Sequence, residues 1–425
     1  MFLVFLLFFG VFLLFPIITT PFLLIPIVYR FRYSRYYLML FVIGISLIAL
    51  RYIPYFTDDG AYHYKAAYLF QFYDNVFDWF GNLMSKNIPT EEYGYYNYPL
   101  FALLLYIFSK TGTYSLVSFT VILIVYFLYT KIIYEIYQKY NISKFLFLLA
   151  LLTMVAIVNV RFTTSGMRYH LAGAIIVFLF YKEIKNGFEL NKTLFYYLIP
   201  ILIHSSAVIF VATRLIFPWF KDASFFKKII ILFSLPIFTL LSPLLQTLNV
   251  EYLSLLLEKF NTYQKTEIFI KLYSTSDLIN VYLGVLISLL YIFLYHTTFR
   301  FQKNLNMKLF LSFVLYICLL TLSVLPFLTI LDRFVWFVYP LVAISMILYV
   351  AYDETFIERL RYNRINYFPF IIVLFLCFIG GIISNRRIFE FLRLIDFNTM
   401  EILTKNVFDY FSDLHHFSLS EVLRR

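Results

Sequence analysis

Two arginines and two histidines stand at breaks between apolar runs in the middle of this chain. Arg161 closes one apolar run, and Arg168 and His170 lie in the polar stretch before the next. A later run is interrupted at His204, which precedes two serines. Ionisable groups among membrane-embedded helices are costly unless they line a wet cavity or meet a partner. These residues are therefore the first candidates for a functional site.

The arginines suit the binding of an anion such as a diphosphate. Arg168 follows Gly166 at the start of a predicted helix, where backbone N–H donors and a guanidinium can grip an anion together. Arg161 would share the face of Arg168 if one helix carried both, although it equally fits an arginine that extends to lipid headgroups. Asp332 and Arg333 are either a local ion pair at a helix start or the second half of the same clamp.

Acidic residues in the first long polar segment are the candidates for proton transfer. Asp58 and Asp59 directly follow an apolar run, and they fit a general base, a partner for arginine or a solvated turn. Adjacent acids are weak grounds for a metal, so no metal site is predicted. Glu91 and Glu92 are more typical of a solvated loop. The tyrosines that follow them are more typical of an interfacial aromatic belt than of a sugar-stacking platform: Tyr93, Tyr95, Tyr96 and Tyr98.

Composition places these residues in a membrane protein. The 425 residues are 62% hydrophobic and 14% charged, which is more apolar surface than a soluble domain of this size can bury. Apolar runs recur at the length that crosses a bilayer as helix, so we expect an all-α polytopic integral membrane protein with roughly 10–12 transmembrane helices and re-entrant segments. The net charge of +11 fits cytoplasmic Lys/Arg loops and not nucleic-acid binding. Cys318 and Cys377 lie in apolar runs, and no cofactor is expected.

Loop charge predicts an unusual turn at His204. If residues 193–217 formed one span, the basic residues after it would fall outside, and every later loop would carry the wrong sign. A break at His204 to Ser206 corrects the alternation, and irregular backbone there is tolerated where it is buried in protein or faces a water-filled cavity.

The remaining boundaries follow from the same alternation. We expect one transmembrane domain over residues 1–384, outer segments at 54–98 and 249–277, and an amphipathic C-terminal tail at 385–425. The run at 99–108 is too short to span. The first 29 residues hold three prolines, which predicts a kinked or broken helix that is retained, not a cleaved signal peptide; its orientation stays open.

Several of these stretches resemble a known family. GMRYHLA (166–172) followed by HSSA (204–207) is similar to the paired signature of the EpsG-like, Wzy-type polysaccharide polymerases. DDGAY (58–62) and EYGY (92–95) resemble the acidic-Tyr and Glu-Gly elements of that family's first long outer loop. LDR (331–333) with the later YPL (339–341) resembles the Asp-Arg…Pro element of O-antigen polymerases. The likeness keeps its order over residues 50–345. It departs at Tyr169-His170, where a glutamine or small residue is expected, so no role is carried onto His170.

The resemblance implies a GT-C-like glycosyltransferase of the bacterial inner membrane. It would join glycan repeat units carried on undecaprenyl diphosphate, with the acceptor hydroxyl attacking the donor's anomeric carbon. A chain-length regulator and a flippase are candidate partners. The candidate catalytic residues are Asp58, Asp59 and His204, and the candidate binding residues are Arg161, Arg168, Asp332, Arg333, Glu92 and Tyr62.

Two other functions stay open at this point. The first is an O-antigen ligase or another GT-C glycosyltransferase, which would use the same lipid-diphosphate chemistry. The second is a flippase or transporter for lipid-linked glycans. We favour it less because the charges gather on one face and no related halves are visible in the sequence.

Overall fold

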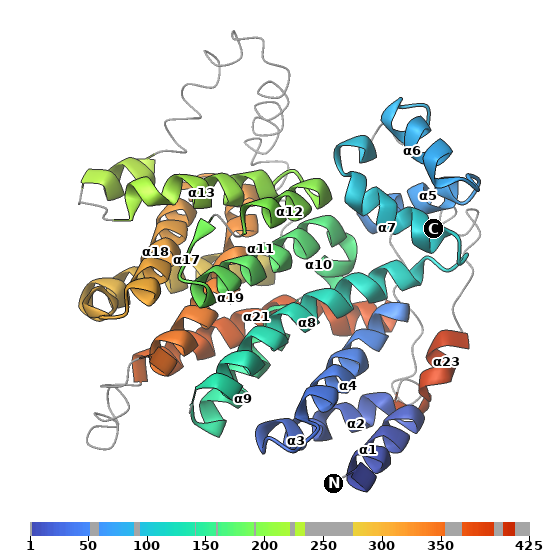
Figure 1. The fold of residues 1–425 in the computed structure, drawn as a ribbon, viewed down its shortest axis with the longest axis horizontal. Helices are drawn as coiled ribbons and strands as arrows, with labels where there is room; N and C mark the ends of the chain where they lie inside the picture. The colour runs from blue at the N-terminus through green and yellow to red at the C-terminus, as the bar shows by residue number, and fades with distance from the viewer. Residues whose placement is uncertain are drawn as a thin grey trace.

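The computed structural model of the chain is a stack of helices joined by turns (Figure 1). It describes residues 2–51, 59–88, 94–140, 142–158, 160–190, 193–221, 226–233, 275–352, 368–394 and 403–412. Within these ranges the secondary structure is helical and includes no strand, which confirms the predicted all-α fold for this part of the chain.

Five helices of the described residues are long and apolar enough to cross a membrane. These stretches are Ser115–Lys139 (α8), Asp277–Phe301 (most of α17, Thr275–Thr297, with η6, Phe299–Phe301), Leu305–Ser323 (α18), Leu328–Tyr352 (α19) and Phe368–Asn385 (the first part of α21, Phe368–Leu394). The expectation of roughly 10–12 crossings counted shorter runs as spans. Seven apolar stretches of the described chain are helical over only 10–17 residues.

Helix α19 forms the centre of the bundle. Its apolar stretch is 94% buried, against 39% for those of α17 and α21, which lie at the outside. It packs against α8, α9, α11, α17, α18 and α21. A helix that is apolar all round needs neighbours on every side, and α19 has them.

The N-terminal segment is broken where prolines were expected to break it. Helices α1 (Phe2–Leu14), α2 (Pro16–Phe22) and α3 (Leu24–Val28) follow one another, with Pro16 at the first position of α2. They pack along α4 (Ser34–Ser46), which continues as η1 (Leu47–Arg51).

The segment expected as a long outer loop is folded in its described part. It holds α5 (Asp59–Phe70), α6 (Val76–Met84) and η3 (Tyr95–Asn97), and it leads into α7 (Pro99–Ser109). Trp79 is buried and stacks on Tyr106 at a ring separation of 4.6 Å, which fixes α6 on α7. These helices form a lobe at one end of the bundle (Figure 1, upper right).

The middle of the chain has three more breaks between helices. Helix α9 (Lys144–Ile157) is followed by α10 (Val160–Ser165) and α11 (Met167–Lys185). After η5 (Leu194–Tyr197), α12 (Leu198–Ile203) stops at His204, whose backbone is extended (φ −154°, ψ 128°), and α13 (Ala207–Phe220) begins. The predicted break at His204 is confirmed.

The C-terminal part differs from the expected tail. Helix α21 continues past the predicted boundary at residue 384 to Leu394. The short helix α23 (Val407–Ser412) returns to α1 and η1, where Tyr410 is buried with Leu47 and Leu50. The described piece of this tail therefore covers the N-terminal helices.

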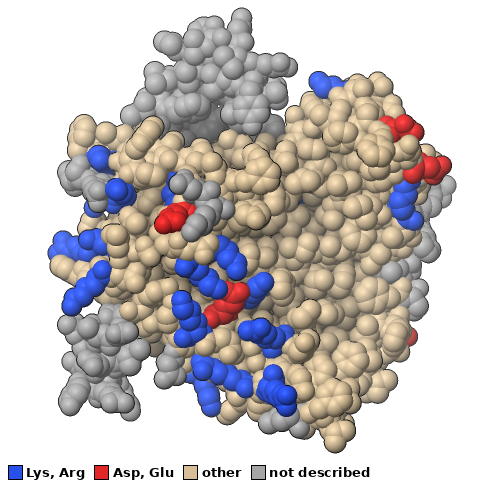
Figure 2. Space-filling view, viewed as in Figure 1, with Lys and Arg blue, Asp and Glu red and all other residues tan. Residues whose placement is uncertain are grey.

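Basic side chains gather at one end of the bundle. The last turns of α8 and α11 hold Lys139, Lys182 and Lys185, and α9 begins with Lys144. Figure 2 shows Lys and Arg side chains concentrated on this part of the surface, to the left and below. This is the end that the loop charges assign to the cytoplasm.

Candidate functional site

Arg168 lies in the first turn of α11, directly after the break at Gly166. Its guanidinium carbon is 4.5 Å from the centroid of the Tyr98 ring and 5.5 Å from that of Tyr95. Both rings are buried, with exposed fractions of 5% for Tyr98 and 0% for Tyr95. A planar cation held over aromatic faces is stabilised by their quadrupoles and is fixed in orientation. The aromatic-belt interpretation is wrong for these two tyrosines, because they lie under Arg168 and not at a lipid interface.

His204 also contacts the ring of Tyr98. Its imidazole stacks on Tyr98 at 5.7 Å with an interplanar angle of 11°, and it meets the edge of Tyr169 at 5.7 Å. The Ser206 N–H donates to Nδ1 of His204 at 3.1 Å, and the Ser206 hydroxyl lies 2.6 Å from the same nitrogen. Because Nδ1 is an acceptor here, the neutral ring carries its proton on Nε2. The turn after α12 thus presents His204 as an N–H donor.

Tyr169 connects this group to α19. Its hydroxyl donates to the backbone carbonyl of Arg333, and the Arg333 guanidinium carbon lies 5.9 Å from the centroid of the Tyr169 ring. Asp332 and Arg333 lie in the second turn of α19 and are half-buried. Segments far apart in the sequence, the starts of α11 and α19 and the end of α12, therefore meet at one place.

The lobe of α5–α7 closes the site from another side. His63 of α5 is 2% exposed, and its Nδ1 lies 2.6 Å from the Tyr95 hydroxyl. Its ring also contacts the edge of Phe101 at 4.9 Å. Burial lowers the pKa of His63 well below its ordinary value, and the nearby charges of Arg168 and His204 lower it further.

His63 was not recognised as part of the site from the sequence. A helix from residue 59 would have placed it one turn after Asp59 on the same face, which is the one available signal.

Comparisons with protein-family models, with curated proteins and with solved structures find no match to this chain.

The structure describes some of the site residues that the sequence predicted and leaves others outside its described ranges. Asp58, Glu91 and Glu92 lie outside the described residues. Asp59 begins α5 and Arg161 belongs to α10, but the description does not extend to their side chains. The shared helix face suggested for Arg161 and Arg168 is wrong, because the break at Gly166 puts them on different helices.

Helices α5, α10 and α11 lie beside one another at the candidate site. Tyr62 lies half-buried on α5, and α10 packs against both α5 and α11. No group of three or more His, Cys, Asp or Glu side chains within the described ranges could hold a metal ion.

The described side chains make an aromatic-walled site rich in cations and donors. Arg168 and Arg333 supply fixed positive charge, and His204 supplies an N–H donor. Such a set stabilises negative charge that develops on a bound oxyanion, most strongly where water is excluded.

Proposed function

We propose that this chain is a polytopic glycosyltransferase of the bacterial inner membrane with a GT-C-like architecture. It joins oligosaccharide repeat units, each carried on undecaprenyl diphosphate, into a surface polysaccharide at the outer face of the membrane. The observation that supports this most is the position of Arg168. Its guanidinium lies over the ring of Tyr98, on which His204 also stacks. The ring of Tyr169 contacts both His204 and Arg333.

The reaction leaves negative charge on the departing diphosphate, and the site holds cations that can stabilise this charge. The acceptor hydroxyl oxygen forms a bond to the donor's anomeric carbon, the bond from that carbon to the diphosphate oxygen breaks, and the electron pair leaves with undecaprenyl diphosphate. Arg168 and Arg333 bind the diphosphate as planar, permanently charged donors. Nε2–H of His204 donates to the same leaving group.

The hydroxyl proton needs a separate acceptor. Since Nδ1 of His204 already accepts from Ser206, His204 serves as a donor and not as the base. Asp58 and Asp59 then remain as the candidate bases, and Asp59 begins the helix that carries His63. The apolar helices would dock the two polyprenyl tails.

The test is the length distribution of the surface glycan. A strain that lacks the protein is complemented with wild type, with Arg168→Ala, or with Arg35→Ala. Arg35 is exposed at the start of α4, so this control removes one arginine far from the site. We expect a ladder with wild type and Arg35→Ala, a single repeat without the protein, and a polymer yield reduced by about 10² or more with Arg168→Ala.

Two outcomes would contradict the proposal. A full ladder from Arg168→Ala at equal expression would remove the diphosphate-binding role of Arg168. Complete loss of surface glycan in the strain without the protein, instead of a single-repeat band, would favour a ligase or a flippase.

A further inference from the structure

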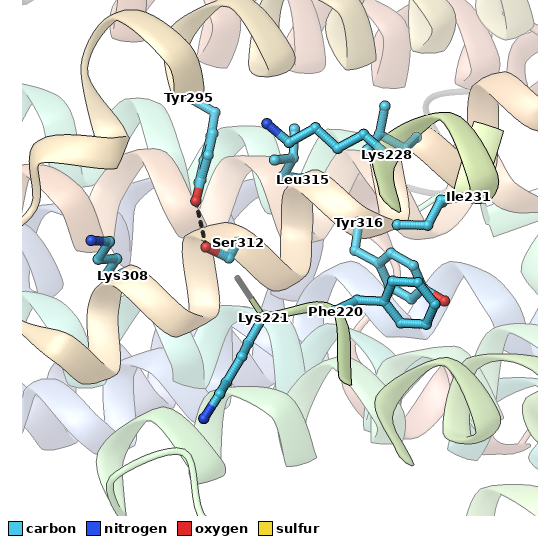
Figure 3. A pocket seen from close by; sticks show the side chains of 10 residues that line it. Phe220, Lys221, Lys228, Ile231, Tyr295, Lys308, Ser312, Leu315 and Tyr316 are labelled. Atoms are coloured by element: carbon cyan, nitrogen blue, oxygen red, sulfur yellow. Dashed lines mark hydrogen bonds between the residues drawn. The ribbon is translucent and has the colours of Figure 1, made fainter. Parts of the chain in front are cut away.

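A pocket lies at the other end of the bundle from Arg168. Its volume is about 200 Å³, and it is formed by the end of α13, the helix at 226–233, the end of α17 and the start of α18 (Figure 3). Helix α13 has 14 residues; it starts close to His204, at Ala207, and reaches this pocket at Phe220. At helical rise that separates the two places by about 20 Å. The pocket is therefore not part of the glycan site.

Three lysines from three elements line this pocket. Lys221 follows α13, Lys228 lies on the helix at 226–233, and Lys308 is in the first turn of α18. Nζ of Lys228 lies 3.3 Å from Nε2 of His296, and burial together with the charge of Arg300 lowers the pKa of Lys228. No carboxylate is among the described residues that line the pocket. Figure 3 shows the three side chains extending in different directions around the pocket, and their summed positive charge attracts an anion to it.

The floor of the pocket is mostly apolar and aromatic, and it includes one hydroxyl pair, Tyr295 and Ser312, whose oxygens are 2.5 Å apart. Ser312, Leu315 and Tyr316 lie on one face of α18 and are buried, whereas Lys221 and Lys308 at the rim are exposed. The Tyr316 ring stacks on Phe220 at 5.5 Å (Figure 3). A charged rim above an apolar floor matches an amphiphile better than it matches an inorganic ion.

The surface around the pocket is itself apolar. Trp219 is 75% exposed, and Phe226, Ile230 and Phe233 are exposed along one face of the neighbouring helix. Large apolar side chains next to lysines are typical of the boundary between acyl chains and headgroups. The lysine-bearing ends of α8 and α11 lie at the same end of the molecule.

We propose that this pocket binds the headgroup of an anionic phospholipid. The lysines Lys221, Lys228 and Lys308 at its rim attract the phosphodiester, and Phe220 and Tyr316 contact the start of its acyl chains. Basic pockets between membrane helices are suited to such headgroups because the attraction to each lysine adds to the burial of the chains. This site is independent of the proposed glycan chemistry, and its ligand comes from the bilayer.

The test compares two lipids on the full chain. Purified protein in detergent is titrated with phosphatidylglycerol or phosphatidylethanolamine of equal acyl chains, and bound lipid is counted by native mass spectrometry. We expect the wild type to prefer phosphatidylglycerol. The variant Lys221→Gln/Lys228→Gln/Lys308→Gln should bind it about tenfold or more weakly. Arginine at the same three positions should retain binding.

The matched control removes equal charge elsewhere on the basic end. Lys131→Gln/Lys139→Gln/Lys144→Gln alters the ends of α8 and α9, outside the pocket, and should bind phosphatidylglycerol as the wild type does. If the triple pocket variant does not fold, Lys221→Gln/Lys308→Gln changes only exposed positions and should still weaken binding several-fold.

Three results would overturn the proposal. They are equal affinity of the wild type for the two lipids, wild-type affinity for phosphatidylglycerol in the folded pocket variants, and displacement of the lipid by inorganic phosphate. The last would identify a site for a free anion.

Discussion

Tyr98 is the residue through which the two halves of the candidate site meet. Arg168 and His204 both contact its ring, and its hydroxyl lies 3.3 Å from Oγ of Ser205. A change at Arg168 or at His204 therefore alters a ring that the other residue also contacts. Arg168 and His204 should be analysed as a coupled pair, in which effects on activity are not additive.

The buried imidazole of His63 makes stability depend on pH. Its pKa in the folded protein lies below the ordinary value of 6.5, so its contribution is fully present above about pH 6.5 and is lost as the pH falls. Between about pH 7.5 and about pH 5.5 this residue should lower the free energy of unfolding by about 1 kcal/mol. Unfolding is measured in detergent at both pH values. Between them, His63→Gln should lose less free energy of unfolding than the wild type.

The control for this prediction is His296→Gln. His296 is exposed near the end of α17, close to the charges of Lys228 and Arg300, so its replacement should reduce the pH dependence by less than His63→Gln does. An equal loss of stability on acidification in His63→Gln and wild type would show that His63 takes up its proton in the folded state.

Between elements, a buried ion pair fastens α11 to α13. Nε of Arg214 donates to Oε2 of Glu183 at 2.6 Å, and both side chains are buried. The other carboxylate oxygen of Glu183 accepts from the hydroxyls of Thr193 (2.8 Å) and Tyr197 (2.6 Å). Arg214 also donates to the carbonyl of Phe188 at 3.2 Å. Arg214 is therefore neutralised inside the bundle.

Breaking this pair should be far more costly than breaking an exposed one. Glu183→Gln leaves a buried arginine without its counter-charge and is expected to destabilise the protein by about 3–5 kcal/mol. Lys185→Met removes the half-exposed pair of Lys185 with Glu135 and should cost about 0–1 kcal/mol. Unfolding in detergent measures both, and similar losses in the two variants would mean that burial does not decide the strength of these pairs.

Gly381 allows α21 to approach the end of α9. A Cβ atom there would lie 2.4 Å from the backbone carbonyl of Ala156, and backbone cannot move aside as a side chain can. One turn later, Asn385 donates to the Ala156 carbonyl at 2.7 Å and to that of Val158 at 3.3 Å. This contact satisfies carbonyls at the end of α9 and so stabilises the break between α9 and α10.

Gly381→Ala should therefore destabilise the protein by about 1–3 kcal/mol through overpacking. Gly10→Ala is the matched control, because nothing lies within 4 Å of a Cβ atom at Gly10 and alanine is the better helix former. The midpoint of thermal unfolding should fall in the first variant and stay or rise in the second. Equal midpoints would contradict the close approach of α21 and α9.

On the scale of the whole molecule, the proposed orientation places the α5–α7 lobe outside and the lysine-bearing ends inside. The two native cysteines are buried and give a low background for thiol labelling. A membrane-impermeant maleimide should label Ser85→Cys, at the exposed end of α6, in cells with a permeable outer layer and an intact inner membrane. It should label Lys303→Cys, exposed before α18, only after that membrane is opened.

Denatured samples of both variants serve as the control for total reactivity. Labelling of both positions in intact cells, or of neither, would contradict the orientation. The reversed pattern would place the Arg168 site in the cytoplasm and exclude polymerisation at the outer face.

Much of the backbone was determined by the sequence alone. The helical class, the breaks at Pro16 and His204 and the short helix at Pro99 follow from run length, proline and the sign of loop charge. Run length and proline positions are local properties, and the sign of a loop's charge is a sum over its residues. None of them depends on which helix packs against which.

The contacts of the site were decided only by the tertiary structure. The sequence nominated Arg168 and His204 but did not show that Tyr98 lies between them, that His63 closes the site or that Glu183 neutralises Arg214. Each of these contacts joins residues from different helices. In so apolar a chain, nearly every helical face can be buried, so periodicity does not choose the partner, and only the packing of the whole bundle does.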